Sequence, residues 1–267
     1  LSLESELKML RVARRLGQAL PLQVKTTLLA AHALPEEFKL DREGYVRMIT
    51  EELLPAVAAE KLADFVDVFC EANYFTVADM ERVLEAGARH QLRGKVHVNQ
   101  FTSCGGVAAA VAHGALSVDH LEVMEEADLR SLQGSATIPT LLPSCSFFLR
   151  IPYAPARALI DRGCAVALAS DHNPGSTPSG NMNLVLSLAC IQLRMLPEEA
   201  LNALTINAAA AMGLERELGS ITVGKRASLI LTRPVPSLAF LPYAFGSDHI
   251  DTVIIDGKPV RTGDALA

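Results

Sequence analysis

The sequence predicts an α/β fold, with a parallel sheet in the body of the chain and a small β unit at its C-terminal end. Six short apolar runs alternate with helical patterns, which is typical of βα units. The runs are almost continuously apolar, as strands covered on both faces of a sheet are. Six strands are two fewer than a closed (β/α)8 barrel of the TIM type needs, so an incomplete barrel and an open doubly wound sheet both fit. No GxGxxG follows any run, so a dinucleotide site has no support.

The predicted strands and helices alternate along the first two thirds of the chain. Leu7, Leu10 and Leu16 have helical spacing near the start, and Thr76 with Asp79 forms a capping box at a later helix start. The predicted strands occupy residues 24–29, 65–70, 95–98, 115–118, 136–142 and 164–169. The predicted helices occupy residues 4–17, 42–63, 76–93 and 105–113, and the chain is mostly helical from 171 to about 212.

The sequence changes in character near its C-terminal end, where turn glycines separate short apolar runs. The strands predicted there occupy residues 219–225, 228–232, 250–255 and 258–260. The last two flank Asp256-Gly257, a dipeptide typical of hairpin turns. We therefore expect two domains, a partial barrel over residues 1–213 and the C-terminal part of a small β-sandwich over residues 214–267.

Composition excludes several classes of protein. Lysine and arginine number 24 against 30 aspartates and glutamates, a net charge of −6, and 50% of the 267 residues are hydrophobic. Intrinsically disordered chains have low hydrophobicity and high net charge, and nucleic-acid binders are generally basic, so neither class fits this composition. No apolar run reaches the roughly 18 residues of a membrane helix, and five dispersed cysteines without a CxxC indicate a reducing compartment. We expect a cytoplasmic protein that binds neither nucleic acid nor membrane.

Three polar residues at predicted strand ends could have a chemical role. A period of two places His97 on one face of its strand with Lys95 and Asn99. Alone, His97 is equally well explained as a buried core histidine. His120 and Asp171 also end apolar runs, and the carboxyl ends of barrel strands meet at one edge. Two histidines and an aspartate at that edge are suitable ligands or acid–base partners for a zinc-type metal.

The segment after Asp171 has two interpretations. Asn173, Gly175 and Ser176 are residue types typical of a turn. A glycine and a serine with free backbone N–H groups after an apolar strand also make a site for an anion and a metal-bound water. His172 is adjacent to Asp171 and is expected to point elsewhere.

Other candidates have weaker support. His32 follows a strand and could hold a substrate, although a lone histidine more often has a structural role. Glu71 also ends a strand, and a lone carboxylate there is weak evidence. Cys104 stands beside two glycines, but no base lies at a telling spacing, so we interpret it as structural.

A set of motifs stands in a characteristic order along the chain. Four of them are KVHVNQF at 95–101, SVDHL at 117–121, LLP at 141–143 and ASDHNPGS at 169–176. Four more are TTLLAAHA at 26–33, DVFCE at 67–71, TINAA at 205–209 and GSITVGK at 219–225. Together these motifs resemble the imidazolonepropionase family of the metal-dependent amidohydrolase superfamily, and the resemblance covers essentially the whole chain.

The resemblance implies a partial (β/α)8 barrel of this hydrolase superfamily and a specific reaction. The reaction is hydrolysis of the cyclic amide 4-imidazolone-5-propanoate to N-formimidoyl-L-glutamate in histidine degradation, with one divalent metal, zinc or iron. His97 and Asp171 match the family's metal ligands, and Asp171 is also expected to take a proton from the bound water. His120 is expected to polarise the reacting carbon or to deliver a proton there.

The resemblance also implies the substrate contacts. Gln100 matches the residue that contacts the substrate ring, and we count it as catalytic together with His120 and Asp171. The other residues that match contacts to substrate or product, including its carboxylate, are His32, Asn173, Gly175 and Ser176. The family is commonly dimeric, which leaves a homodimer open.

One part of the family's pattern is missing. Its first metal-binding pair is a His-x-His, and no His-x-His occurs in these 267 residues. The chain begins at Leu1-Ser2-Leu3. In the family, a substrate-binding arginine and the tyrosine of a Ser-Gly-Tyr-Gly run come before the segment that corresponds to these residues. We therefore expect about two barrel strands of the complete enzyme to be absent. Because catalytic metal sites generally keep at least three protein ligands, we expect the isolated chain to bind metal poorly and to be inactive.

Two alternatives stay open. The first is another cyclic amidohydrolase or a heterocycle deaminase, and Gln100 argues against the deaminases, which usually have a glutamate in that region. The second is a non-catalytic binding chain that has lost its metal site. The missing His-x-His favours this second alternative, whereas the joint presence of His97, His120 and Asp171 disfavours it.

Overall fold

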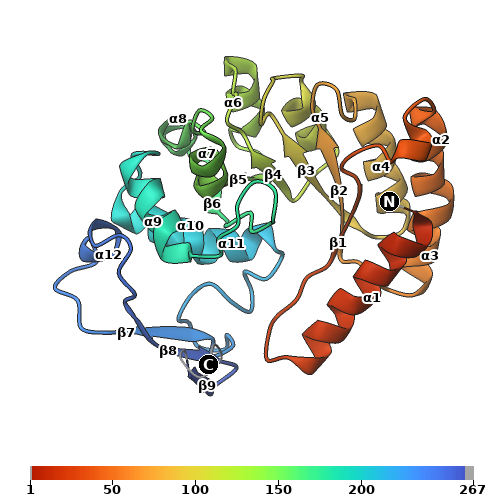
Figure 1. Cartoon of the computed structure of the whole chain (residues 1–267). Helices are drawn as coiled ribbons and strands as arrows, with labels where there is room; N and C mark the ends of the chain where they lie inside the picture. Colours follow the sequence, from red (N-terminus) through yellow and green to blue (C-terminus); the bar gives the residue numbers. More distant parts are fainter. Residues whose placement is uncertain (1, 262–267) are drawn as a thin grey trace. The chain divides into compact units, whose positions relative to one another are not determined.

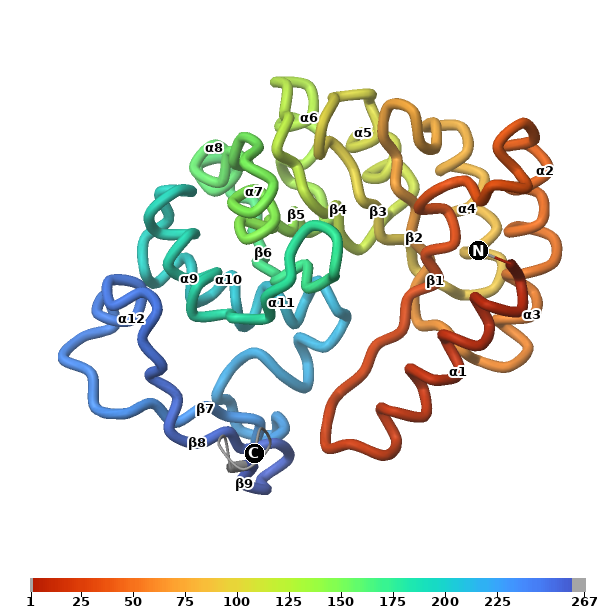
Figure 2. Tube along the Cα trace, viewed as in Figure 1, coloured from red at the N-terminus to blue at the C-terminus, as the bar shows by residue number. Residues whose placement is uncertain are grey.

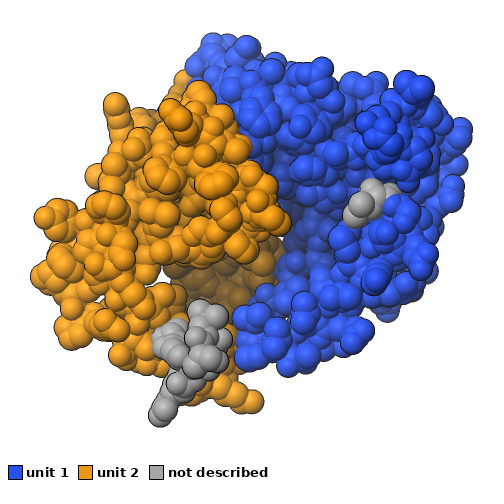
Figure 3. Space-filling view, in the orientation of Figure 1, with its two compact units in different colours: residues 1–139 blue, residues 140–267 orange. Residues whose placement is uncertain are grey.

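The computed structural model describes residues 2–261 and shows alternating helices and parallel strands, with a small antiparallel sheet formed by the last strands (Figure 1). The chain divides into two compact units, Leu1–Pro139 and Thr140–Ala267, coloured blue and orange in Figure 3. The boundary between the two units falls inside the fifth strand. The expected domain boundary between residues 213 and 214 stays a prediction.

A parallel sheet forms the body of the structure. Its strands are β1 (Thr27–Ala31), β2 (Phe65–Cys70), β3 (Arg93–Val98), β4 (Ser117–His120), β5 (Ile138–Leu141) and β6 (Ala167–Leu168). They lie in the order of the chain, and the pairs β1–β2, β2–β3, β3–β4 and β5–β6 are parallel. The six strands predicted from the apolar runs are therefore confirmed, with β1 shifted toward the C-terminus and β6 shorter than expected.

The helices of the first unit alternate with β1 to β4 along the chain. They are α1 (Leu3–Ala19), the 3-10 helix η1 (Glu36–Phe38), α2 (Arg42–Met48), the π-helix η2 (Ile49–Leu53), α3 (Leu54–Ala59), α4 (Val77–Arg89), α5 (Gly106–Ala112) and α6 (Glu126–Leu132). Of these, α1, α4 and α5 pack directly on strands. Helix α4 packs on β2 and β3, where a Cβ on Gly87 would lie 2.4 Å from Val66 Cγ1. This close approach explains the glycine in the last turn of the helix. Figure 2 shows residues 20–26 returning from α1 to β1 as an extended segment.

Local signals in the sequence determine where several helices start. The predicted capping box forms at α4, since the Asp79 N–H donates to Thr76 Oγ1 at 3.2 Å and the Thr76 N–H donates to Asp79 Oδ2 at 2.9 Å. The helix predicted over 42–63 is also present, as α2, η2 and α3 in direct succession, but it ends at Ala59. No helix in the part of the chain that the structure describes is long and apolar enough to cross a membrane.

The second unit is mainly helical and ends in a three-stranded sheet. Its helices are α7 (Pro143–Leu149), α8 (Ala156–Asp161), α9 (Met182–Ile191), α10 (Pro197–Leu204), α11 (Ile206–Ala211) and α12 (Phe240–Tyr243). Its antiparallel sheet consists of β7 (Leu229–Thr232), β8 (Ile250–Ile255) and β9 (Lys258–Arg261). Asp256 and Gly257 turn between β8 and β9 with φ of 50° and 77°, which confirms the predicted hairpin. A second layer that would make this sheet a sandwich stays a prediction.

The strand predicted over residues 219–225 is wrong. These residues form turns, with the Lys225 N–H donating to Thr222 O at 3.1 Å. Ile221 and Val223 are 89% and 104% exposed. A strand needs a neighbour for its backbone groups, and none of the described residues pairs with this segment.

Candidate functional site

Three histidines gather at the carboxyl ends of strands in the first unit. His32 follows β1, His97 lies in β3 and His120 ends β4. The ring centroids of His97 and His120 are 5.4 Å apart, and those of His32 and His97 are 6.4 Å apart. His32 also stacks on Phe69 of β2, with centroids 5.3 Å apart and planes at 20°. The structure thus brings together the three histidines singled out in the sequence.

The backbone is left-handed at several of these strand ends. His120 has a φ of 88°, Leu121 of 67° and Asn99 of 57°, and in the second unit Asp171 has a φ of 53°. Non-glycine residues seldom adopt this conformation, and such residues cluster at functional sites. Asn99 is buried, and its Nδ2 donates to Asp128 Oδ2 at 2.9 Å. Strand β3 ends at Val98, so its period-two alternation does not extend to Asn99.

Asp67 of β2 holds His97 from the neighbouring strand. Asp67 Oδ2 lies 2.9 Å from His97 Nδ1, and Asp67 Oδ1 accepts a hydrogen bond from the His97 main-chain N–H at 3.2 Å. Burial alone would raise the pKa of the Asp67 carboxyl, but His97, Lys95 and the Val68 N–H together hold that pKa below its usual range. With Nδ1 against this carboxylate, Nε2 is the His97 atom that would bind a metal.

A polar network continues from this pair along the neighbouring strands. Lys95 Nζ donates to Ser117 Oγ at 2.5 Å and lies 3.8 Å from Asp119 Oδ2, and Ser117 Oγ donates to Asp119 Oδ1 at 2.7 Å. One potential metal-ligand atom from each of Asp67, His97 and Asp119 lies within 4.8 Å of the other two, close enough for a shared cation. The Lys95 ammonium already supplies positive charge there, so we interpret the network as the support of His97.

Sequence reasoning missed the two carboxylates of this network. Asp67 and Asp119 each interrupt an otherwise apolar strand, and they are 2% and 8% exposed. Charged side chains are seldom buried without a partner. A lone aspartate inside a buried strand was therefore the signal that could have found them.

His120 lies deep in the first unit beside Glu122. The His120 ring is buried, and its Nδ1 has no hydrogen-bond partner among the described residues. Glu122 Oε2 lies 3.6 Å from that nitrogen, beyond the range of a normal hydrogen bond. A buried ring nitrogen of this kind is suited to a role in proton transfer or ligand binding.

Glu71 fixes the loop that follows Gln100. Gln100 is 7% exposed and comes just after β3. Glu71 Oε2 accepts hydrogen bonds from the N–H groups of Phe101 at 2.9 Å and Thr102 at 3.3 Å, and Glu71 Oε1 accepts one from the Thr102 hydroxyl. Glu71, for which the sequence offered only weak evidence of a role, thus positions the loop that follows the predicted catalytic residue Gln100.

In the second unit, the loop after β6 is tied together around Asp171. Asn173 Nδ2 donates to Ser176 Oγ at 2.8 Å, and Ser176 Oγ donates to Asp171 Oδ2 at 3.1 Å. Thr177 Oγ1 lies 3.5 Å from the same carboxylate oxygen. These contacts orient the carboxylate of the predicted ligand. The neighbouring His172 is exposed.

The expectation of free N–H groups at Gly175 and Ser176 is wrong. Both N–H groups donate to Asn173 Oδ1 at 2.8 Å. Asparagine side chains commonly bond to the backbone two or three residues ahead in such turns. An anion could reach these N–H groups only after the Asn173 side chain moved away.

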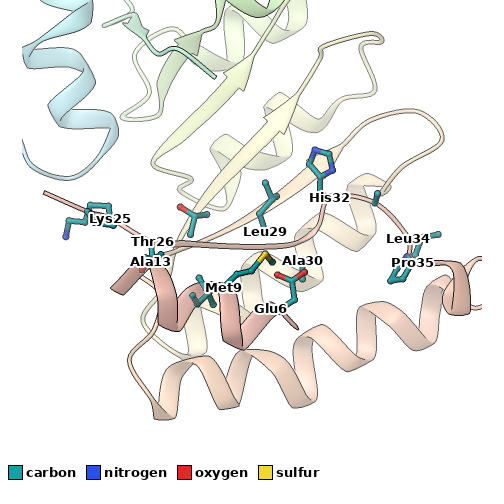
Figure 4. A pocket seen from close by; sticks show the side chains of 14 residues that line it. Glu6, Met9, Ala13, Lys25, Thr26, Leu29, Ala30, His32, Leu34 and Pro35 are labelled. Atoms are coloured by element: carbon teal, nitrogen blue, oxygen red, sulfur yellow. The ribbon is translucent and has the colours of Figure 1, made fainter. Parts of the chain in front are cut away.

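A pocket of about 700 Å³ lies between α1 and β1 in the first unit (Figure 4). Figure 4 shows Glu6 and Met9 of α1 on one side, and Leu29 and Ala30 of β1 on the other. Of the residues predicted to act in catalysis or binding, His32 alone lines it among the described residues.

Comparisons with known proteins identify relatives of the chain. A sequence profile of the amidohydrolase family matches residues 32–260. The chain is 55% identical over 255 residues to a protein named imidazolonepropionase from Christiangramia forsetii, covering 96% of this chain and 62% of the relative. It is 54% identical over 258 residues to a protein of the same name from Flavobacterium johnsoniae, covering 97% and 63%. The chain thus spans about three fifths of the length of these relatives.

Solved structures show the same fold at low sequence identity. An adenosine deaminase from Xanthomonas campestris with bound zinc aligns with a TM-score of 0.74 and 20% identity, covering 97% of this chain and 65% of that one. A triazine hydrolase variant aligns with a TM-score of 0.76 and 16% identity, covering 95% and 64%. This similarity supports the predicted barrel-type architecture of the parallel sheet and its helices.

Proposed function

The chain belongs to the amidohydrolase family, and from this premise we propose that its protein hydrolyses 4-imidazolone-5-propanoate to N-formimidoyl-L-glutamate in histidine degradation. The observation that carries this proposal is the 55% identity to a relative named imidazolonepropionase over 255 residues. The row of His32, His97 and His120 at the strand ends supports a hydrolytic site. In this reaction a carbon–nitrogen bond of a cyclic amide breaks and water adds across it.

We propose that His97 and Asp171 contribute ligands to one divalent metal, zinc or iron. Imidazole nitrogen and carboxylate oxygen are suitable ligands for both metals. Asp67 holds Nδ1 of His97, and Ser176 holds Oδ2 of Asp171, so both ligands have the supporting contacts that metal sites use. When bound, such a metal lowers the pKa of a coordinated water to about 7 and polarises a carbonyl group.

Two side chains are proposed to move protons. Asp171 would take a proton from the attacking water, because a carboxylate oriented by neighbouring hydroxyls can act as a general base. His120 would polarise the reacting carbonyl or deliver a proton at the ring nitrogen that leaves. Glu122, 3.6 Å from His120 Nδ1, faces that side of the imidazole, so Nε2 is the atom proposed to face the substrate.

The substrate contacts are proposed from Gln100, His32 and the loop after Asp171. Gln100 would contact the substrate ring, from the loop that Glu71 holds. Asn173, Gly175 and Ser176 would bind the substrate carboxylate if the Asn173 side chain releases the two N–H groups that it now accepts from. The binding of carboxylate would thus replace one acceptor by another.

An assay on 4-imidazolone-5-propanoate tests the proposal. The complete gene product that contains this chain should hydrolyse this substrate, and the His97→Ala variant should lose metal and activity together. Turnover of guanine or cytosine without hydrolysis of the imidazolone would instead establish a heterocycle deaminase. Absence of any turnover in a metal-loaded protein would favour a binding chain.

The remaining expectations about the protein stay proposals. The substrate class makes a small molecule the proposed partner. A homodimer, a cytoplasmic location and the absence of nucleic-acid or membrane binding are proposed on composition and resemblance alone.

A further inference from the structure

Two cysteines of the first unit, Cys70 and Cys104, lie beside the proposed site and have no part in the proposed reaction. Cys70 is the last residue of β2 and is buried, whereas Cys104 lies in the loop before α5 and is exposed. Their Sγ atoms are 3.8 Å apart. They are 34 residues apart in the chain, so only the fold makes them a pair.

Neighbouring groups keep the two sulfur atoms together. Glu71, next to Cys70, holds the N–H groups of Phe101 and Thr102 in the loop that leads to Cys104. On the other side of that loop, Ser103 Oγ donates to Asp128 Oδ2 at 3.0 Å.

Gly106 makes room for this contact. A Cβ at Gly106 would lie 2.9 Å from Cys70 Sγ and 2.7 Å from Val98 Cγ2. A larger residue would therefore push against the sulfur of Cys70. This glycine lets the start of α5 approach the end of β2.

The two thiols have opposite acidities. The hydrogen bond from Cys70 and the Gly106 N–H lower the pKa of Cys104 to about 6, although burial and the Glu71 and Asp128 carboxylates act in the other direction. The same hydrogen bond raises the pKa of Cys70, as do burial and the nearby Cys104, Glu71 and Asp79. Cys104 is therefore the thiol of the pair that is poised to react as a thiolate.

We propose that Cys70 and Cys104 form a peroxide-responsive dithiol that closes to an intramolecular disulfide. The Cys104 thiolate attacks one oxygen of hydrogen peroxide and becomes a sulfenic acid, and the hydroxide that leaves takes a proton and becomes water. The Cys70 sulfur then attacks the sulfenic sulfur, and the departing hydroxide takes the Cys70 proton to form a second water. Two thiols are oxidised by two electrons in all, and one peroxide is reduced to two waters.

The second step follows from the first. The Cys104 thiolate helps to keep Cys70 protonated in two ways, by accepting a hydrogen bond from it and by its negative charge. Neither effect of the thiolate remains once Cys104 has become a neutral sulfenic acid. The sulfurs must then close from 3.8 Å to about 2.05 Å. The bond would join the end of β2 to the loop that begins at Gln100.

Thiol chemistry on the purified protein tests this proposal without any substrate. Alkylation by iodoacetamide should reach half its maximal rate near pH 6 at Cys104, and only at alkaline pH at Cys164 and Cys190, where burial raises the thiol pKa. Stoichiometric peroxide should then yield one disulfide-linked peptide pair containing Cys70 and Cys104, reversed by dithiothreitol. Because no readout uses turnover, failure here is separable from failure of the proposed reaction.

Three variants sharpen the test. Cys104→Ser should abolish the fast reaction with peroxide. Cys70→Ala should leave that reaction but stop it at a sulfenic acid that dimedone traps, whereas the matched control Cys190→Ser should behave as the parent protein. Alkylation of Cys104 no faster than of Cys190 at pH 6, or peroxide giving no bond between Cys70 and Cys104, would overturn the proposal.

Discussion

Asp67 and His97 form a buried pair across two adjacent strands, with Asp67 Oδ2 2.9 Å from His97 Nδ1. The other carboxylate oxygen accepts the His97 main-chain N–H at 3.2 Å. One carboxylate therefore holds both the ring and the backbone of the proposed ligand. Asp67 is 2% exposed, and the pairing of β2 with β3 places it beside His97. The sheet therefore sets the orientation of the imidazole.

Asp67→Asn should weaken metal binding in the complete enzyme by about 10- to 100-fold, the usual effect of losing the carboxylate behind a ligating histidine. Competition with a zinc chelator measures this affinity. The matched control is Asp161→Asn, an exposed aspartate that pairs with Arg157 on the same helix. Equal affinities of the Asp67 variant and the parent would contradict the positioning role.

Asp171→Ala in the complete enzyme should lower kcat by at least about 100-fold, as expected for loss of a general base. The side chain is part of a surface loop and the fold should stay intact, which circular dichroism and Tm can check. Near-normal turnover in this variant would refute the proposed role. Ser176→Ala should have a smaller effect, because it removes one donor to the carboxylate and leaves the carboxylate itself.

Glu71→Ala should release the loop that follows Gln100. The variant loses hydrogen bonds from Phe101 and Thr102 to a charged acceptor, each worth about 1.5–3 kcal/mol. Amide hydrogen exchange at these two residues should speed up by about 10- to 100-fold. Exchange at the parent rate would show that the loop is held by other contacts. Glu85→Ala, on the exposed face of α4, is the matched control.

Asp64→Asn should make the stability of the protein less dependent on pH in acid. Asp64 accepts the Thr26 N–H at 2.9 Å and pairs with Arg14 and Lys25. Burial raises the pKa of Asp64, but these three partners lower it below its usual value overall. The unfolded chain therefore binds the proton first as pH falls, so the stabilisation is complete above about pH 4 and is lost below the folded pKa.

Urea unfolding at several pH values measures this effect. The free energy of unfolding of Asp64→Asn should be about 1–3 kcal/mol below that of the parent at pH 7, and this difference should shrink as the pH falls below about 4. A difference of constant size across the whole pH range would show that the effect comes from packing and not from the charge.

The chain of residues 1–267 alone should bind zinc weakly and should not hydrolyse the imidazolone. It contains no His-x-His, and two proposed ligands are fewer than the three that catalytic zinc sites keep. Calorimetric titration with zinc measures the affinity. Tight binding by a 1–267 chain with His97 replaced by alanine would show that other residues hold the metal.

Several features could be predicted from short segments because short-range chemistry decides them. The apolar runs gave six strands, and the capping box formed at Thr76 and Asp79, where side chain and backbone are three residues apart. The Asp256-Gly257 turn joined two strands directly. The run 219–225 has the same alternation of apolar and polar residues as a strand but forms turns. A strand needs a neighbouring strand to pair with, and the residues of the run do not themselves supply one.

The sequence by itself determined the βα alternation, the family, and the placing of His97 and His120 at strand ends. Only the tertiary structure decided that Asp67 supports His97, that Glu71 holds the loop after Gln100, and that Cys70 meets Cys104. The physical reason is that these contacts join residues about 30 positions apart in the chain. The order and register of the strands decide which of these residues meet, and no local pattern of residues encodes that order and register.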